Sequence, residues 1–159
     1  MKFLGLARAI ERALDVFLLI AISMMLVSIC IQVAGRYLFG YAPSWTEEVA
    51  RFLVIWVTMV GSAVMLRRGG HIAVTVAVDA LPRRLGLAVG WLRDALILIM
   101  AGALAYYGYM FAVIGGRRDS AALEIPMYYP YLAIPVGAAL IALLLTLSRA
   151  GRLAGEPEA

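Results

Sequence analysis

The chain is organised around the stretch Ser44-Trp45-Thr46-Glu47-Glu48-Val49-Ala50-Arg51. Ser44 and Glu47 have the spacing of a capping box, in which the hydroxyl and the carboxylate each accept a hydrogen bond from the other residue's backbone N–H. Glu47 precedes Arg51 by four residues, the better order for an ion pair on a helix. An uncharged run, residues 52–66, follows directly. The stretch therefore predicts the entry of a helix into a membrane, with the Trp45 indole at the water boundary.

These polar residues have two interpretations. In the first they only cap and anchor the helix, a contribution of roughly 1 kcal/mol. In the second they form a docking surface for other proteins, since two carboxylates and a cation at a membrane edge are more than a cap requires. The candidate interface or scaffold residues are Arg36, Trp45, Glu47, Glu48 and Arg51.

Composition places the chain in the membrane. Its 159 residues are 64% hydrophobic and 15% charged, against about 45–50% and about 25% in soluble domains. The 14 Lys and Arg residues lie between apolar blocks, which is typical of topology signals and not of a nucleic-acid surface. With one cysteine, Cys30, and one histidine, His71, neither an internal disulfide nor a thiolate metal site is expected. We expect no cofactor.

Four apolar runs are long enough to span a bilayer, and they predict an all-α integral membrane protein with one membrane domain, residues 1–159. The four predicted transmembrane helices are residues 16–35, 45–66, 95–116 and 125–148. Residues 1–15 form an amphipathic N-terminal helix, which either lies in the interface or extends the first span. The order of a basic start and an apolar run also suits a signal peptide, but no clear Ala-x-Ala pattern follows, so we expect the span to be retained.

Two segments are less regular. Residues 72–79 alternate like a strand. A lone strand beside lipid leaves backbone groups unpaired, so we expect a short interfacial helix between the second and third spans. Pro130 and Pro135 predict a kinked or irregular first half of the last span.

Helix packing is predicted from two stripes. Gln32 lies four residues from both Ser28 and Arg36, a polar stripe that should face protein and not lipid. The third span carries a stripe of small residues that lets another helix approach closely. These are Ala101, Ala105, Gly108, Ala112 and Gly115.

The distribution of cations predicts the orientation. If the N-terminus is cytoplasmic, the outer loops hold four of the 14 Lys and Arg residues, namely Arg36, Arg51, Arg117 and Arg118. The other ten lie on the inner side. The positive-inside rule then predicts that both termini are cytoplasmic and that residues 44–51 face outward.

The sequence offers little for chemistry within the chain. An enzyme needs a nucleophile, a base or a metal in a shielded pocket, and a transporter usually places ionisable groups near the midplane. Here the predicted spans carry ionisable groups only near their ends: Glu47, Glu48 and Arg51. The chain is therefore not expected to be an enzyme or to move a polar solute alone, and it is suited to packing against another membrane protein.

Several motifs together resemble the small membrane subunit of TRAP (tripartite ATP-independent periplasmic) transporters, the DctQ-like or Q component. The residues that carry the resemblance are Arg36-Tyr37, the run from Trp45 to Arg51, Gly61, Arg67-Arg68-Gly69-Gly70-His71-Ile72, Leu81-Pro82 and Ile125-Pro126 with Tyr131 to Gly137. The resemblance covers nearly the whole chain. The chain departs from the family pattern near His71, where the nearest following acid is Asp79.

The resemblance implies a role in a tripartite system of the bacterial inner membrane. A periplasmic binding protein (P) captures an organic acid, and a large membrane subunit (M) holds the transport path and its sodium sites. The small subunit scaffolds M and helps form the docking face, a role carried over here to Trp45, Glu47, Glu48 and Arg51. The expected partners are M, P and membrane lipids, with no nucleic acid. The alternatives are a self-contained small exporter, for which we find no acid deep in a helix, and a structural or sensory membrane protein.

Overall fold

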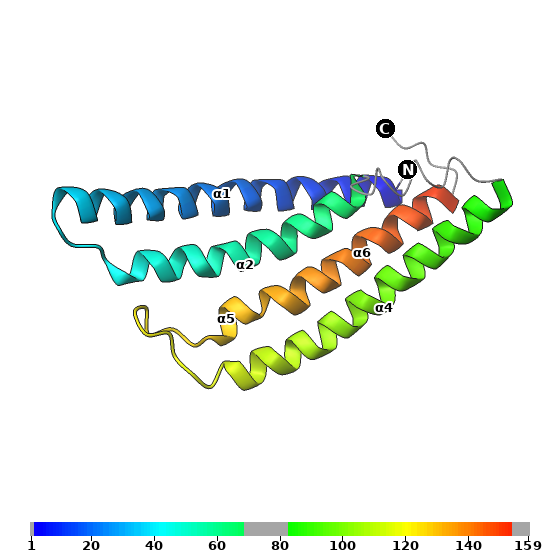
Figure 1. The fold of residues 1–159 in the computed structure, drawn as a ribbon. Coiled ribbons are helices and arrows are strands. Elements are labelled where there is room, and N and C mark those ends of the chain that lie inside the picture. Colours follow the sequence, from blue (N-terminus) through cyan, green and yellow to red (C-terminus); the bar gives the residue numbers. More distant parts are fainter. Residues whose placement is uncertain (1, 69–82, 154–159) are drawn as a thin grey trace.

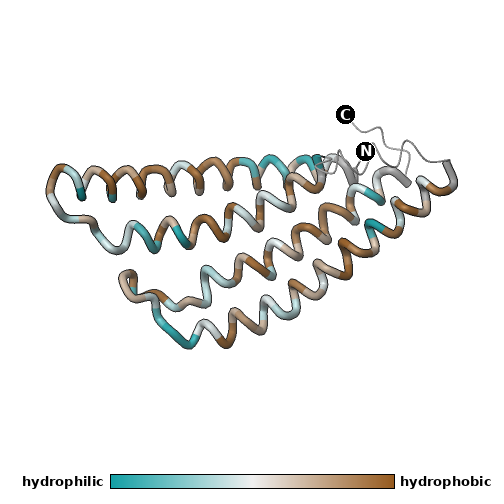
Figure 2. Tube along the Cα trace, in the orientation of Figure 1, coloured by the Kyte–Doolittle hydropathy of each residue, from teal (hydrophilic) through white to brown (hydrophobic). Residues whose placement is uncertain are grey.

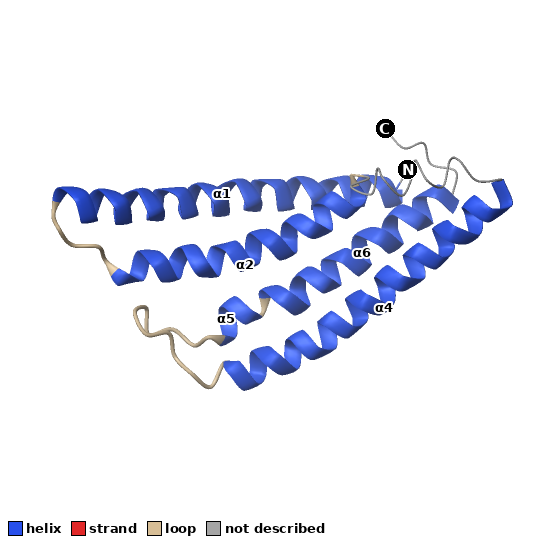
Figure 3. Ribbon diagram, viewed as in Figure 1, coloured by secondary structure: helices blue, strands red, loops and turns tan. Residues whose placement is uncertain are grey.

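The computed structural model describes residues 2–68 and 83–153. The predicted interfacial helix, and His71 with it, lies outside the described residues. Within them the chain forms α1 (Lys2–Leu38), α2 (Ser44–Arg67), α4 (Arg83–Gly115), α5 (Tyr128–Tyr131) and α6 (Ala133–Leu153). Figure 3 shows helices joined by loops, with no strand in the described parts of the chain.

The four long helices lie side by side (Figure 1). α2 packs between α1 and α6, and α6 packs between α2 and α4. The starts of α1 and α4 and the ends of α2 and α6 lie together, and we call this the terminal end of the bundle. The turn 39–43 and the loop 116–127 lie at the opposite end, which we call the loop end.

Four helical segments of the described chain are long and apolar enough to cross a membrane, which confirms the predicted all-α membrane fold. They are Gly5–Leu38, Ser44–Leu66, Ala88–Gly115 and Tyr128–Gly151. Hydrophobic residues fill the middle of these helices, and hydrophilic residues gather toward the ends (Figure 2). Large apolar side chains such as Leu19, Ile99 and Ile114 are more than half exposed, as expected for surfaces that lipid or another membrane protein covers.

Residues 2–15 continue into the first span without a break, so the amphipathic segment forms the first turns of α1. Ile10 and Leu14 pack against the core of the bundle. On the polar side, Arg68 at the end of α2 donates to Glu11 over 2.8 Å and also binds Asp15. These ion pairs join the start of α1 to the end of α2.

The buried core consists mainly of small side chains. Ala63, Ala101, Ile141 and Leu144 form its centre, each no more than 7% exposed. α2 and α6 approach closely at Gly137, where a Cβ would lie 2.6 Å from the Met59 Cβ. Because lipid gives no hydrophobic drive for helices to associate, such close van der Waals packing holds a membrane bundle together.

The last span is irregular in its first half, as its prolines predict. It consists of α5 and α6 with a break at Leu132. Pro135 has no N–H to donate to the carbonyl of Tyr131, and a proline ring also clashes with the carbonyl four residues before it. The regular helical bond resumes with Val136, whose N–H donates to Leu132 O over 3.1 Å. The helical part begins at Tyr128, three residues after the predicted start of the span.

Candidate functional site

The predicted capping box at the start of α2 is wrong. Pro43 occupies the N-cap position with φ −63° and ψ 126°, Ser44 is already helical, and no side chain caps the helix. A capping hydroxyl must come from the extended residue before the first turn, and that residue here is a proline. The buried Thr46 hydroxyl instead donates to Pro43 O over 2.6 Å. Ser28 of α1 donates to Thr46 O over 2.8 Å, which ties α1 to the start of α2.

The two adjacent acids of α2 point to different partners. Glu47 accepts from Arg51 over 2.7 Å, the pair that the four-residue spacing predicts. Both side chains of this pair are more than 60% exposed. Trp45, in the first turn of the same helix at the loop end of the bundle, is 42% exposed. This part of α2 is therefore open to lipid headgroups or to another protein.

Glu48 instead organises the loop between α4 and α5. Its carboxylate accepts the hydroxyl of Ser120 and the backbone N–H groups of Ala122, at 3.1 Å, and Leu123, at 3.0 Å. The loop closes on itself as Ser120 N donates to Ile125 O over 2.9 Å and Glu124 N donates to Ser120 O over 3.1 Å. A carboxylate can accept several hydrogen bonds at once, and bonds to a charged acceptor are the strong ones. Glu48 thus holds the loop to α2.

The remaining residue of the predicted interface, Arg36, is exposed in the last turn of α1. Gln32, which was predicted to pack against another helix, lies one turn earlier and is half-buried. After α1 the chain reverses through Gly40, which has φ +66°, a conformation that favours glycine. Tyr37 and Phe39 at this turn are more than 80% exposed. The loop end therefore presents cations and aromatic rings together.

The small-residue stripe of α4 lies against α5 and α6. Ala101, Gly108 and Ala112 are buried, and Ala105 is half-buried. A Cβ at Gly108 would lie 2.6 Å from the Ile134 Cγ2, and one at Gly115 would lie 2.6 Å from the Tyr131 ring. These contacts bring the loop end of α4 close to the irregular start of the last span.

A second polar cluster, at the terminal end, was not predicted. Asp94 of α4 is 4% exposed. Arg93 donates to its Oδ1 from Nε over 2.9 Å and from a second nitrogen over 2.8 Å. Arg149 of α6 binds the same carboxylate, donates to Gly90 O over 3.3 Å, and lies over the Trp91 ring at 5.4 Å from its centroid. The cluster fastens α4 to α6.

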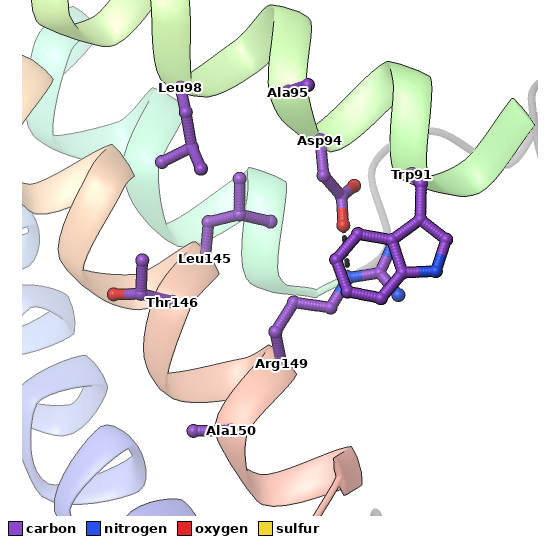
Figure 4. Close-up of a pocket in the computed structure, with 8 residues that line it drawn as sticks. All are labelled: Trp91, Asp94, Ala95, Leu98, Leu145, Thr146, Arg149 and Ala150. Atoms are coloured by element: carbon purple, nitrogen blue, oxygen red, sulfur yellow. Dashed lines mark hydrogen bonds and ion pairs between the residues drawn. The ribbon is translucent and has the colours of Figure 1, made fainter. Parts of the chain in front are cut away.

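The cluster closes one end of a groove of about 430 Å³ between α4 and α6 (Figure 4). Trp91, Asp94 and Arg149 lie at one end of the groove, and Leu98 and Leu145 lie toward the other. Sequence reasoning missed this site because Asp94 and Arg149 are 55 positions apart. The feature of the sequence that could have indicated the site is Asp94, a single acid next to Arg93 near the start of an apolar run.

No group of three or more His, Cys, Asp or Glu side chains within residues 2–68 and 83–153 is placed to hold a metal ion. The acids that lie in the spanning helices near their ends are held by partners within this chain: Glu11 and Asp15 by Arg68, Glu47 by Arg51, Glu48 by the loop, and Asp94 by two arginines. The Glu48 contacts hold a loop to α2, and the Asp94 contacts hold α4 to α6.

Residues 25–154 match the family described as "Tripartite ATP-independent periplasmic transporters, DctQ component". The chain belongs to the DctQ family. The match extends from within α1 to the end of α6 and includes both polar clusters.

Named relatives agree with the family assignment. The DctQ-family chain is 28% identical over 106 residues to the sialic acid TRAP transporter small permease protein SiaQ of Vibrio cholerae serotype O1, covering 67% of this chain and 61% of SiaQ. It is 30% identical over 127 residues to the ectoine TRAP transporter small permease protein TeaB of Halomonas elongata, covering 77% of this chain and 64% of TeaB. A third relative, the isethionate TRAP transporter permease protein DctMQ of Oleidesulfovibrio alaskensis, is 29% identical over 145 residues, 86% of this chain and 23% of DctMQ. The chain thus spans less than two thirds of the length of these relatives.

Proposed function

We propose that this DctQ-family chain scaffolds the large membrane subunit of a sodium-driven TRAP transporter for organic acids and contributes to the docking face for a periplasmic binding protein. The observation that carries the proposal is the placement of charge. The middle of each predicted span has no Asp, Glu, Lys, Arg or His residue, so the four helices offer no charged path of their own for an acid. Their exposed apolar faces suit lipid and a second membrane protein.

The relative named DctMQ supports a large membrane partner. The matched part is only 23% of DctMQ, so a DctQ-like unit there shares a chain with a much longer remainder. When two units share one chain in a relative, their counterparts are expected to bind each other where they are separate chains. We infer that the exposed apolar faces of the four-helix bundle include the surface that the large subunit covers.

The nature of the solute is proposed from the names of relatives. They are named for sialic acid, isethionate and C4-dicarboxylate, and one for ectoine. One kind of small subunit therefore accompanies transporters of different solutes, most of them organic acids. We infer that the solute and sodium sites lie on the other subunits, which agrees with the uncharged middle of these helices.

The docking role is assigned to the loop end. The positive-inside count puts both termini in the cytoplasm of a bacterial inner membrane and the loop end in the periplasm. There the exposed Glu47–Arg51 pair, Trp45 and Arg36 offer charge and an aromatic ring to a soluble partner. Glu48 serves this face indirectly, because its carboxylate is already bound to the loop.

Reconstitution tests the proposal. Proteoliposomes would contain this chain alone, the large subunit with the binding protein, or all three, and uptake of an organic acid would be measured with and without a sodium gradient. We expect sodium-dependent uptake only from the complete set. Uptake by this chain alone would refute the scaffold role and favour a self-contained transporter. Full uptake without this chain would refute an obligatory role.

A further inference from the structure

The groove between α4 and α6 is lined almost entirely by apolar surface, and the charged groups of Asp94 and Arg149 lie at one end of it. Leu98 lies seven residues beyond Trp91 along α4, which is about 10 Å deeper along the helix axis. Trp91 is three residues from the start of the spanning segment Ala88–Gly115, and Arg149 is two residues from the end of Tyr128–Gly151. The charged end thus lies at the membrane boundary and the other end points toward the middle of the bilayer, in the order of a phospholipid headgroup and its acyl chain.

The polar groups at this end of the groove differ in whether they keep an unused hydrogen-bond donor. The Thr146 hydroxyl donates to Ala142 O and Leu143 O of its own helix, both over 2.9 Å. The Asp94 carboxylate is held by two guanidinium groups. The Arg149 guanidinium has five N–H donors. It donates to Asp94 and to Gly90 O, and it lies over the Trp91 ring. The other donors of Arg149, whose side chain is 27% exposed, remain for a ligand at the end of the groove and not along its apolar walls.

The charges of the cluster do not cancel. One carboxylate, Asp94, faces two guanidinium groups, so Arg93, Asp94 and Arg149 together carry one net positive charge. Both arginine side chains are 27% exposed, so water does not fully screen them. A guanidinium group is well suited to bind a phosphate, and the cavity of about 430 Å³ is of the size of ligand sites, about 300–1,000 Å³.

We propose that this groove binds one anionic phospholipid from the leaflet at the terminal end of the bundle. The phosphate contacts Arg149 beside Trp91, and one acyl chain lies along Ala95, Leu98 and Leu145. Bound there, the lipid covers the seam between α4 and α6. In the orientation proposed above this is the cytoplasmic leaflet, although the site itself does not depend on transport.

Lipid binding by the purified full-length chain tests the proposal. Native mass spectrometry would follow titration with phosphatidylglycerol, with phosphatidylcholine and with inorganic phosphate. We expect one phosphatidylglycerol to bind about tenfold more tightly than phosphatidylcholine, the effect of roughly one charged hydrogen bond. Equal binding of the two lipids, or displacement of phosphatidylglycerol by millimolar-scale inorganic phosphate, would overturn the proposal.

Two variants separate charge from shape. Arg93→Gln makes the cluster neutral without altering the groove, because Arg93 does not line it. It should lower phosphatidylglycerol affinity about tenfold. Leu98→Trp fills the apolar end and should abolish binding of the one lipid. The matched controls are Arg117→Gln, which removes one charge at the loop end, and Leu96→Trp, which adds the same bulk at a 57% exposed position of α4.

A second measurement reports position. The chain has three tryptophans, and with Trp45 and Trp56 replaced by phenylalanine, Trp91 remains as the fluorescent probe. Phosphatidylglycerol brominated on its acyl chain should quench Trp91 at lower lipid concentration than brominated phosphatidylcholine does. Far-ultraviolet circular dichroism confirms that each variant keeps its helices. If the groove variants and their controls bind lipid equally in folded protein, the site does not bind lipid.

Discussion

Replacing Gly137 by alanine should loosen the packing of α2 against α6. The added Cβ would lie 2.6 Å from the Met59 Cβ and 3.1 Å from both the carbonyl carbon and the carbonyl oxygen of Met59. Carbon atoms in ordinary contact are about 3.5–4.0 Å apart, so the two helices must separate by about 1 Å. Because two of the obstructing atoms belong to the backbone, a change of side-chain rotamer cannot relieve the contact.

The magnitude follows from two opposing effects. Overpacking a well-packed site costs about 1–3 kcal/mol, and the backbone obstruction places this site near the upper value. Alanine in place of glycine favours the helix by about 1 kcal/mol. We therefore expect Gly137→Ala to lower the free energy of unfolding by about 2 kcal/mol. At about 2–4 °C per kcal/mol for a chain of this size, the midpoint should fall by about 4–8 °C.

Gly102→Ala is the matched control, since a Cβ at this position of α4 meets nothing within 4 Å. It should keep only the helix-propensity gain of about 1 kcal/mol. Thermal unfolding in one detergent, followed by far-ultraviolet circular dichroism, compares both variants with the original chain. If Gly137→Ala unfolds at or above the temperature of Gly102→Ala, the close approach of α2 and α6 at Met59 does not limit stability, and the reasoning is refuted.

Three further changes test the polar contacts. Glu48→Gln should speed hydrogen exchange at the Ala122 and Leu123 amides, because a neutral amide is a weaker acceptor than a carboxylate. The control Glu47→Gln, at the neighbouring position, should leave that exchange unchanged. Equal exchange rates in the two variants would count against the Glu48 contact. Arg51→Glu should weaken co-purification with the large subunit in detergent, while the isolated chain still inserts into the membrane. If the variant still forms an intact, fully active complex, Arg51 serves only in the ion pair with Glu47. Asp94→Asn should lower the free energy of unfolding by about 2 kcal/mol, since it leaves two partly buried guanidinium groups without an anion. Thermal unfolding in detergent at low and high salt measures this loss. An unchanged unfolding midpoint would show that water already solvates the cluster.

The spanning helices were predictable because their signal is local and repeated. A run of uncharged residues must be helical to satisfy its backbone in lipid, and the positions of Pro130 and Pro135 locate the irregular start of the last span. Residues three and four apart share a helix face, which is the basis of the predicted small-residue stripe. Gly108 and Ala112 accordingly lie together on the buried side of α4.

The polar contacts were not predictable because their partners are distant in sequence. Glu48 and Ser120 are 72 positions apart, and no periodicity connects them. The capping box failed for a local reason, namely that Pro43 takes the N-cap position and Ser44 falls inside the helix. The sequence alone could not distinguish Glu47, which stays exposed, from Glu48, which holds a loop.

The bond between Glu48 and the loop has a consequence for the kinetics of assembly. A loop that orders only when a partner arrives slows association and weakens it by the conformational entropy lost in the complex. Here residues 120–125 are already fixed by their own hydrogen bonds and by α2. A soluble partner that docks at this end meets a surface that is ready before the encounter. Its association should then be governed by diffusion and by electrostatic attraction, and its rate should fall as the salt concentration rises.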